Sequence, residues 1–183
     1  MQINFKKISY IVIAITITTI IVILGIFFSF RLIYPNKYDD IVQKYSTEYG
    51  VDSNLVKSMI WVESKFKPKA ISNKGALGLM QLLPSTAEWL NSFLDNHGND
   101  CGDLYAPDTN IKLGVFYLSK LLKQFDSIKL AVVAYNAGPG NVSAWLRNPN
   151  YTQDSQLIFI PFKETQNYLN KVLKVRLIYN KIY

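Results

Sequence analysis

The first part of the sequence contains an uncharged apolar run that few water-soluble folds can accommodate. No charged residue occurs from position 8 to position 30, and isoleucine, valine, leucine and phenylalanine dominate this segment. At about 1.5 Å of rise per residue such a run forms a helix roughly 34 Å long, which is enough to cross the apolar core of a bilayer. Because the run is apolar on every face, a buried core helix is a weaker interpretation. We therefore predict a transmembrane helix over residues 8–30.

The residues that flank this run bear on its processing and its orientation. A cleaved signal peptide has a shorter apolar core followed by small residues at the cleavage site, and residues 29–34 offer no convincing site of that kind. An uncleaved anchor is therefore expected. Lys6 and Lys7 precede the run, while Arg31, Lys37 and Lys44 follow it, so the distribution of positive charge does not decide which end lies inside the cell.

After a short linker at residues 31–37, the rest of the chain (residues 38–183) has helical periodicity and no useful strand alternation. The fold class predicted is all-α, with one globular domain. Asp52 and Asp108 are the expected N-caps of two of its helices, and Gly50 is expected to end the first. The predicted helices cover residues 39–49, 53–66, 84–90, 109–125, 128–137, 142–146 and 161–183, and the predicted loops cover residues 71–81 and 91–103.

Composition excludes some classes of site and leaves others open. The formal charge of +7 suits an anionic partner, which could be nucleic acid, anionic lipid or an acidic cell wall. The lysines are scattered over several helices without a recognised nucleic-acid-binding motif, so no nucleic-acid partner is expected. The single cysteine, Cys101, allows no intrachain disulfide, and the single histidine, His97, makes a metal site improbable. We expect no cofactor and no metal.

One residue breaks the apolar pattern of the helix that follows Asp52. With Leu55 at zero and 100° per residue, Glu63 falls at about 80°, in the middle of the apolar arc, while Lys57 and Ser58 lie on the opposite side. A buried carboxylate is normally paired, protonated or functional. A structural ion pair, or a helix end that turns away from the core, is the competing interpretation. If the site is partly apolar, desolvation should raise the pKa of Glu63, as a general acid requires.

The motifs around this residue resemble the catalytic domain of the soluble lytic transglycosylases. They are Glu63-Ser64, Gly78-Leu79-Met80-Gln81, Ala134-Tyr135-Asn136-Ala137-Gly138 and Pro161-Phe162-x-Glu164-Thr165-x-x-Tyr168. Each block alone is weak, but the ordered set is specific and covers roughly Tyr38 to the C-terminus. The resemblance implies a lysozyme-like helical fold with a glycan-binding groove.

The same resemblance implies cleavage of the β-1,4 bond between N-acetylmuramic acid and N-acetylglucosamine in peptidoglycan, with formation of a 1,6-anhydro ring. It assigns Glu63 as the single catalytic acid–base and Tyr168 as the residue whose hydroxyl holds the Glu63 carboxyl. Glu164, near the first turn of the last helix, stays outside the expected catalytic set, because a carboxylate is favoured there by the helix dipole alone. The expected substrate-binding residues are Ser64, Gly78, Met80, Gln81, Tyr135, Asn136 and Tyr168.

Two other functions remain as alternatives at this point. A hydrolytic muramidase would cleave the same bond with water and would need a second positioned carboxylate. A non-catalytic glycan-binding module would keep the fold but lose the motif glutamate, which is present here. If the substrate is peptidoglycan, the anchor places residues 1–7 in the cytoplasm and residues 38–183 on the outer face of the cell membrane. The expected partners are therefore the glycan strands and, through residues 8–30, the membrane.

Overall fold

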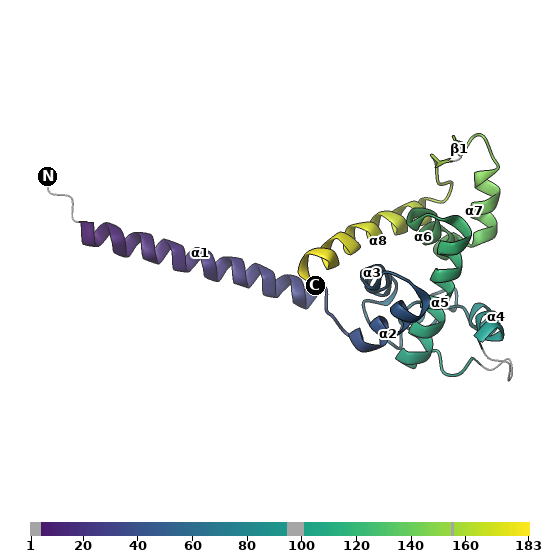
Figure 1. The fold of residues 1–183 in the computed structure, drawn as a ribbon, viewed down its shortest axis with the longest axis horizontal. Helices are drawn as coiled ribbons and strands as arrows, with labels where there is room; N and C mark the ends of the chain where they lie inside the picture. Colours follow the sequence, from purple (N-terminus) through teal and green to yellow (C-terminus); the bar gives the residue numbers. More distant parts are fainter. Residues whose placement is uncertain (1–4, 95–100, 155) are drawn as a thin grey trace. The chain divides into compact units, whose positions relative to one another are not determined.

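The computed structural model describes residues 5–94, 101–154 and 156–183, and the chain divides into two units. One unit comprises Met1–Asn36 with Ile182–Tyr183, and the other comprises Lys37–Lys181. The first contains the long helix α1 (Phe5–Ile33), drawn in purple in Figure 1. The sequence predicts no metal site at His97, and this residue lies outside the described residues.

Helix α1 has the properties of a membrane-spanning segment by length and composition. Its stretch Ser9–Ile33 has a mean hydropathy of 3.0, and its apolar side chains are exposed. The hydroxyls of Thr16, Thr18, Thr19 and Ser29 each donate to the carbonyl four residues earlier, at 2.8–2.9 Å. Polar groups satisfied within their own helix suit an apolar surrounding, because no water is needed to complete their hydrogen bonds.

The second unit is built from helices, which confirms the predicted all-α class. In the described residues, two-residue strands form one hairpin that the sequence did not predict: Thr152 pairs with Leu157, and Gln153 with Gln156. The elements are α2 (Asp39–Tyr49), α3 (Ser53–Ser64), α4 (Pro84–Leu94), α5 (Pro107–Phe125), α6 (Ile128–Ala137), α7 (Pro139–Leu146), β1 (Thr152–Gln153), β2 (Gln156–Leu157) and α8 (Lys163–Ile182).

Several predicted helix boundaries were wrong, and local backbone chemistry explains two of them. Asp108 does not cap α5; the helix begins at Pro107, whose ring already fixes a helical φ and whose missing N–H costs nothing in a first turn. Asp108 instead accepts a hydrogen bond from the Tyr45 hydroxyl at 2.7 Å. Helix α3 ends at Ser64, because Lys65 and Phe66 both adopt left-handed φ values, of 54° and 58°. Asp52 was correctly predicted as the α3 N-cap and accepts from the Leu55 N–H.

The remaining boundary differences lengthen or shorten helices by a turn or less. Helix α4 continues past Leu90 to Leu94, into the predicted loop. Helix α7 begins at Pro139 rather than 142, and α8 begins at Lys163 rather than 161. Pro161 and Phe162 thus lie before α8, while Glu63, Tyr135, Asn136 and Tyr168 lie on the helices predicted for them.

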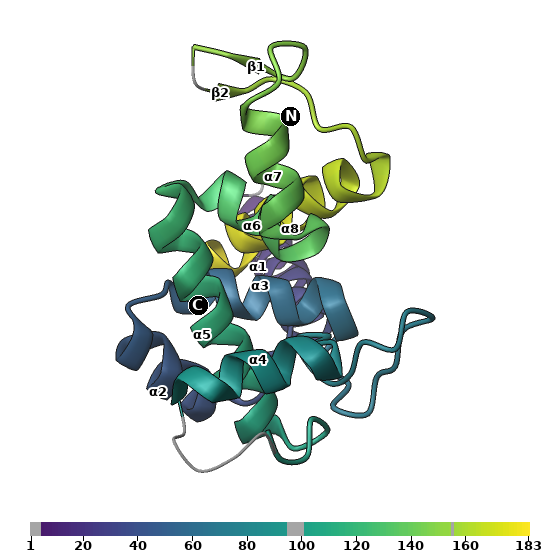
Figure 2. The ribbon, with the colours of Figure 1, turned by 90° about the vertical axis from the view of Figure 1, so that its right-hand side faces the viewer.

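Helix α5 forms the centre of the unit, with α2, α4 and α6 packed against it (Figure 2). Its buried side includes Ile111, Leu118 and Leu121, which are almost completely inaccessible to solvent. Helix α3 is also buried on the side that carries Lys57 and Ser58. The ammonium of Lys57 pairs there with the Asp39 carboxylate at 2.6 Å, so the charge is compensated where water is excluded.

A buried asparagine on α5 fixes the irregular segment between α3 and α4. The Oδ1 atom of Asn110 accepts from the Met80 N–H at 2.7 Å, and its Nδ2 atom donates to the carbonyls of Leu77 at 3.0 Å and Leu104 at 2.9 Å. Gly78 lies against this amide with φ +78°, and a Cβ there would come within 2.2 Å of the Asn110 nitrogen. Only glycine fits at this position, so the segment has one conformation relative to α5.

Replacing Asn110 by alanine should destabilise the domain, because it leaves buried donors and acceptors without partners. We expect the free energy of unfolding to fall by about 3 kcal/mol, given roughly 1–3 kcal/mol for each buried group left unsatisfied. Chemical denaturation of the full chain in detergent, followed by tryptophan fluorescence, measures the change. Asn170→Ala is the matched control, since this asparagine is exposed. Equal stability of the two variants would contradict the assignment.

Candidate active site

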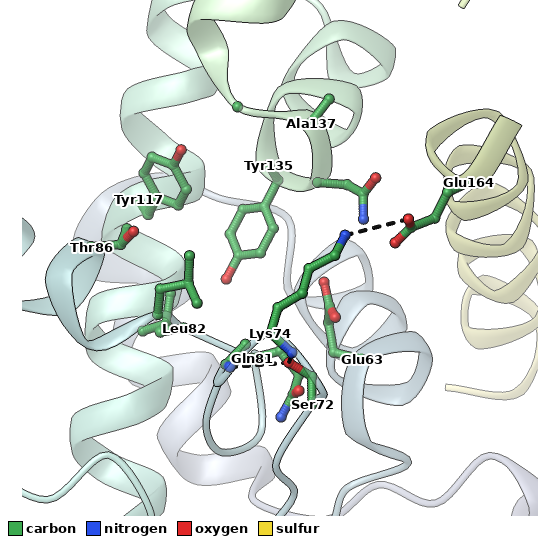
Figure 3. Close-up of a pocket in the computed structure, with 14 residues that line it drawn as sticks. Glu63, Ser72, Lys74, Gln81, Leu82, Thr86, Tyr117, Tyr135, Ala137 and Glu164 are labelled. Carbon is green, nitrogen blue, oxygen red and sulfur yellow. Dashed lines mark hydrogen bonds and ion pairs between the residues drawn. The ribbon is translucent and has the colours of Figure 1, made fainter. Parts of the chain in front are cut away.

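A cavity of about 380 Å³ opens between the irregular segment and the motif residues of α3 and α6 (Figure 3). Elements far apart in the sequence contribute its walls: the end of α3, the segment that precedes α4, helices α4, α5 and α6, and the start of α8. The residues that line it are Glu63, Ser72, Lys74, Ala76, Gln81, Leu82, Leu83, Thr86, Tyr117, Tyr135, Asn136, Ala137, Gly138 and Glu164.

The carboxyl group of Glu63 points into this cavity from the last turn of α3 (Figure 3). Burial raises the pKa of Glu63 from 4.5 to about 7, because the charged form loses solvation. The Tyr168 hydrogen bond lowers this pKa in part, and the nearby Glu164 charge raises it again. A carboxyl group with a pKa near 7 exists in both protonation states at neutral pH, which suits an acid–base catalyst.

Tyr168 on α8 holds the Glu63 carboxyl from the protein side. Its hydroxyl donates to Glu63 Oε1 at 2.7 Å, the contact that the resemblance led us to expect. The tyrosine side chain is itself buried, and burial together with the adjacent carboxylate raises its pKa well above 10. Tyr168 is therefore a permanent hydrogen-bond donor, and one carboxyl oxygen is fixed while the group faces the cavity.

A second carboxylate, Glu164, lies on the same cavity wall. It forms an ion pair with Lys74 at 3.4 Å, which joins the start of α8 to the segment before α4 (Figure 3). Both side chains are mostly exposed, so the pair contributes little to stability. Its effect on the site is electrostatic, because the ammonium of Lys74 partly neutralises the Glu164 charge that faces Glu63.

The motif on α6 supplies two further cavity residues. The Tyr135 hydroxyl donates to the carbonyl of Met80 at 3.0 Å, and burial followed by the Glu63 and Tyr117 charges raises its pKa well above 10. Asn136 accepts from the Thr165 hydroxyl at 2.7 Å through Oδ1, so its amide nitrogen is oriented as a donor for a ligand. Both residues sit at the end of α6, just before Gly138 turns the chain into α7.

The structure brings Glu63, Gln81, Tyr135 and Asn136 together on the cavity wall and puts Tyr168 behind Glu63. The other predicted binding residues lie beneath this wall. The Ser64 hydroxyl is buried and donates to the Leu79 carbonyl at 2.8 Å, and Met80 is fully buried. Gly78 packs against Asn110. Their observed contacts support the loop that carries Gln81, whose Nε2 donates to the Gly78 carbonyl at 2.9 Å.

The sequence did not single out several residues that shape the cavity. Thr165 lies within one of the resembling blocks and Asn110 lies in a predicted helix, but they bond to residues 29 and 30 positions away, through hydrogen bonds that no local pattern reveals. Lys74 stands in a loop without periodicity, and Tyr117 falls within the apolar repeat of α5. Glu164 was set aside because its position near a helix start has an ordinary explanation.

The fold and the site define a lysozyme-like helical domain with one half-buried glutamate in its cleft. Residues 40–158, well over half of the chain, match the family described as the transglycosylase SLT domain. The chain belongs to this family.

Several lytic murein transglycosylases are similar in sequence to most of this chain. The soluble lytic murein transglycosylase of Escherichia coli K12 is 35% identical over 144 residues, which are 76% of this chain and 22% of that protein. Membrane-bound lytic murein transglycosylase C of Haemophilus ducreyi is 33% identical over 170 residues, covering 80% of this chain and 46% of that protein. This chain therefore matches less than half of either protein.

Solved structures give the same picture of the fold. The X-ray structure of an inactive mutant of the lytic transglycosylase Slt from Pseudomonas aeruginosa matches 82% of this chain with a TM-score of 0.73 and 34% identity. The 70 kDa soluble lytic transglycosylase of Escherichia coli matches 83% of it with a TM-score of 0.74 and 32% identity. In both cases this chain corresponds to 25% of the larger protein.

Replacing Tyr168 by phenylalanine should raise the pKa of Glu63 further, because it removes the hydrogen bond that stabilises the carboxylate. NMR titration of glutamate-labelled protein measures this, with the Glu63 signal assigned by its loss in Glu63→Gln. Tyr117→Phe is the matched control. Tyr117 lines the same cavity, but it forms no hydrogen bond to Glu63 and does not contribute to the shift of the Glu63 pKa. A Glu63 that titrates near 4.5 in the unmodified protein, or an unchanged pKa in Tyr168→Phe, would contradict this account.

Proposed function

We propose that this protein is a membrane-anchored peptidoglycan lytic transglycosylase that cleaves the β-1,4 bond between N-acetylmuramic acid and N-acetylglucosamine. The observation that carries the proposal is Glu63, whose pKa is raised to about 7 and whose carboxyl faces a cavity in a domain of the transglycosylase family. The relatives named as lytic murein transglycosylases support the same reaction class.

In the proposed reaction Glu63 acts first as an acid and then as a base. Its protonated carboxyl donates to the glycosidic oxygen, and the bond between this oxygen and the anomeric carbon breaks. The resulting carboxylate then accepts the proton of the muramoyl 6-hydroxyl, whose oxygen bonds to the anomeric carbon and closes the 1,6-anhydro ring. Glu63 regains its proton and no water is consumed. A pKa near 7 serves both half-reactions, since a general acid–base is most effective when its pKa lies near the working pH and both of its protonation states are populated.

The surrounding residues have roles that fit this sequence of steps. Tyr168 fixes one carboxyl oxygen, so the other is available for the proton transfers. Asn136 and Gln81 offer amide groups to the hydroxyl and acetamido groups of the sugar. The substrate's own 2-acetamido group would stabilise the positive charge at the anomeric carbon, which removes the need for a second protein carboxylate. No cofactor is required by this chemistry.

Hydrolysis is the second candidate, and Glu164 is the observation that favours it. A muramidase needs a second carboxylate to activate water or to stabilise the positive centre, and Glu164 shares the cavity wall with Glu63. The ion pair with Lys74 argues against a free base at this position. The products of the two reactions differ by one water, which makes them distinguishable.

Mass spectrometry of the muropeptides released from purified peptidoglycan by the detergent-solubilised full chain tests the proposal. We expect products one water lighter than hydrolytic muropeptides, and a loss of at least about 10²-fold in their rate of release with Glu63→Gln. Reducing-end products that depend on Glu63 and Glu164 would instead identify a muramidase. Retained wall binding without release of any product would indicate a non-catalytic module.

The proposed location follows from the substrate. Peptidoglycan lies outside the cytoplasmic membrane, so α1 would cross this membrane once with residues 1–7 inside and the helical domain on the outer face. The length and hydropathy of α1 and the membrane-bound relative support anchoring. A tether of this kind restricts the enzyme to the glycan strands nearest the membrane.

A reporter enzyme fused after Tyr183 tests the orientation. A reporter that works only after export, such as a periplasmic phosphatase, should be active in this fusion, whereas one that requires the cytoplasm should be inactive. A fusion at the other end, before Met1, serves as the matched control and should give the opposite pattern. Activity of the C-terminal fusion only in the cytoplasm would exclude peptidoglycan as the substrate.

A further inference from the structure

A row of aromatic side chains leads out of the cavity along α5 and α4. It starts at Tyr135 on the cavity wall, whose ring centroid lies 5.2 Å from that of Tyr117. Tyr117 lies 6.2 Å from Trp89 in an edge-to-face arrangement, and Trp89 lies 5.1 Å from Phe93 in the same arrangement. The row of neighbouring rings therefore joins the cavity wall to the outer rings.

The outer half of this row is exposed. Trp89 is 47% exposed and Phe93 is 53% exposed, whereas Tyr117 is buried, with only 9% of its surface exposed. Thr86, Trp89 and Phe93 are spaced by three and four residues on α4, so they share one helix face, and Thr86 already lines the cavity. Two adjacent aromatic side chains, each about half exposed beside a cavity, offer apolar area on which a ligand can pack.

A lysine places a positive charge on this surface. The ammonium of Lys120 lies 3.8 Å from the centre of the Phe93 ring, 5.7 Å from that of Trp89 and 5.4 Å from that of Phe116. Lys120 is one turn beyond Tyr117 on α5 and is half-buried, with its ammonium placed over the rings. The surface therefore combines apolar ring area with one cation.

We propose that Trp89, Phe93 and Lys120 form an outer glycan-binding subsite for a sugar unit of the strand whose scissile bond lies at Glu63. The proposal rests on the proposed function and extends it by naming where a distant part of the substrate binds. The C–H faces of an N-acetylated pyranose pack on the two aromatic rings, and Lys120 binds a carboxylate carried by the sugar. Muramic acid carries such a carboxylate on its lactyl group wherever no peptide is attached to it.

Charge and continuity favour this occupant over other apolar partners. Thr86 lines the catalytic cavity and shares one face of α4 with Trp89 and Phe93, so a strand bound at Glu63 can extend along this face. A cation beside the rings suits an anionic glycan. The same cation would have to be desolvated to bury this face against an apolar protein surface.

Binding measurements on the full chain in detergent test the subsite. The Glu63→Gln background blocks turnover, so affinity is read without cleavage. Isothermal titration calorimetry would compare a peptide-free muramic-acid glycan of eight or so sugars with one of about half that length. We expect Trp89→Ala to weaken binding of the long ligand about fivefold or more and that of the short ligand less than twofold. Trp89→Phe, which keeps an aromatic ring, should restore most of the loss.

Lys120→Gln tests the charge separately. It should weaken binding of the muramic-acid glycan and leave the affinity for a neutral chitooligosaccharide of equal length unchanged, because the latter has no carboxylate. Phe159→Ala is the matched control, since Phe159 is 55% exposed and does not line the cavity. Thermal unfolding of each variant identifies any that has lost its fold.

The other outcomes overturn the subsite in distinguishable ways. If the Glu63→Gln parent binds neither glycan, the proposed function fails together with the subsite. If the parent binds but Trp89→Ala binds both lengths as tightly, or weakens both equally, only the subsite fails. If Trp89→Ala changes the oligomeric state in sedimentation while glycan affinity is unchanged, this face binds a second copy of the chain.

Discussion

The carboxyl group of Glu63 is placed where an apolar side chain would otherwise pack, and the rest of the site compensates for that placement. Burial raises the pKa of this carboxyl group, because the charged form loses solvation. The Tyr168 hydrogen bond offsets part of this cost by stabilising the charged form, and the result is a pKa of about 7. A shift of this pKa in either direction would lower the fraction of one of the two protonation states at neutral pH.

The scaffold holds this group through contacts between distant segments. Helix α3 ends immediately after Glu63, and the Ser64 hydroxyl joins that end to the Leu79 carbonyl. The same segment is bound on its other side by Asn110 and by the Tyr135 hydroxyl, both through the backbone of Met80. Because the segment makes these bonds through backbone atoms rather than flexible side chains, the cavity wall is fixed to α3, α5 and α6 together. This rigidity places Gln81 and Asn136 at set positions relative to Glu63.

Periodicity was sufficient to predict the helical class and to find Glu63, because a carboxylate in an apolar arc is a local signal. It was also enough to predict that desolvation would raise the Glu63 pKa, which the structure bears out. It misplaced the start of α5, since a proline in the first turn competed with Asp108 as the boundary signal. It missed the hairpin at residues 152–157, whose strands are too short to alternate. It also missed two long-range interactions. The hydrogen bond between Asn110 and the Met80 N–H joins residues 30 positions apart, and the ion pair of Lys74 with Glu164 joins residues 90 positions apart, so only folding brings the partners together.

The ionisable groups around Glu63 are arranged so that its own proton is the main variable charge in the cavity. Tyr135 and Tyr168 are neutral donors, because burial and the adjacent carboxylate raise their pKa values well above 10. Glu164 faces the cavity as half of an ion pair with Lys74. Among these groups Glu63 has a pKa near neutral pH, which suits the role proposed for it as a single residue that acts as acid and then as base.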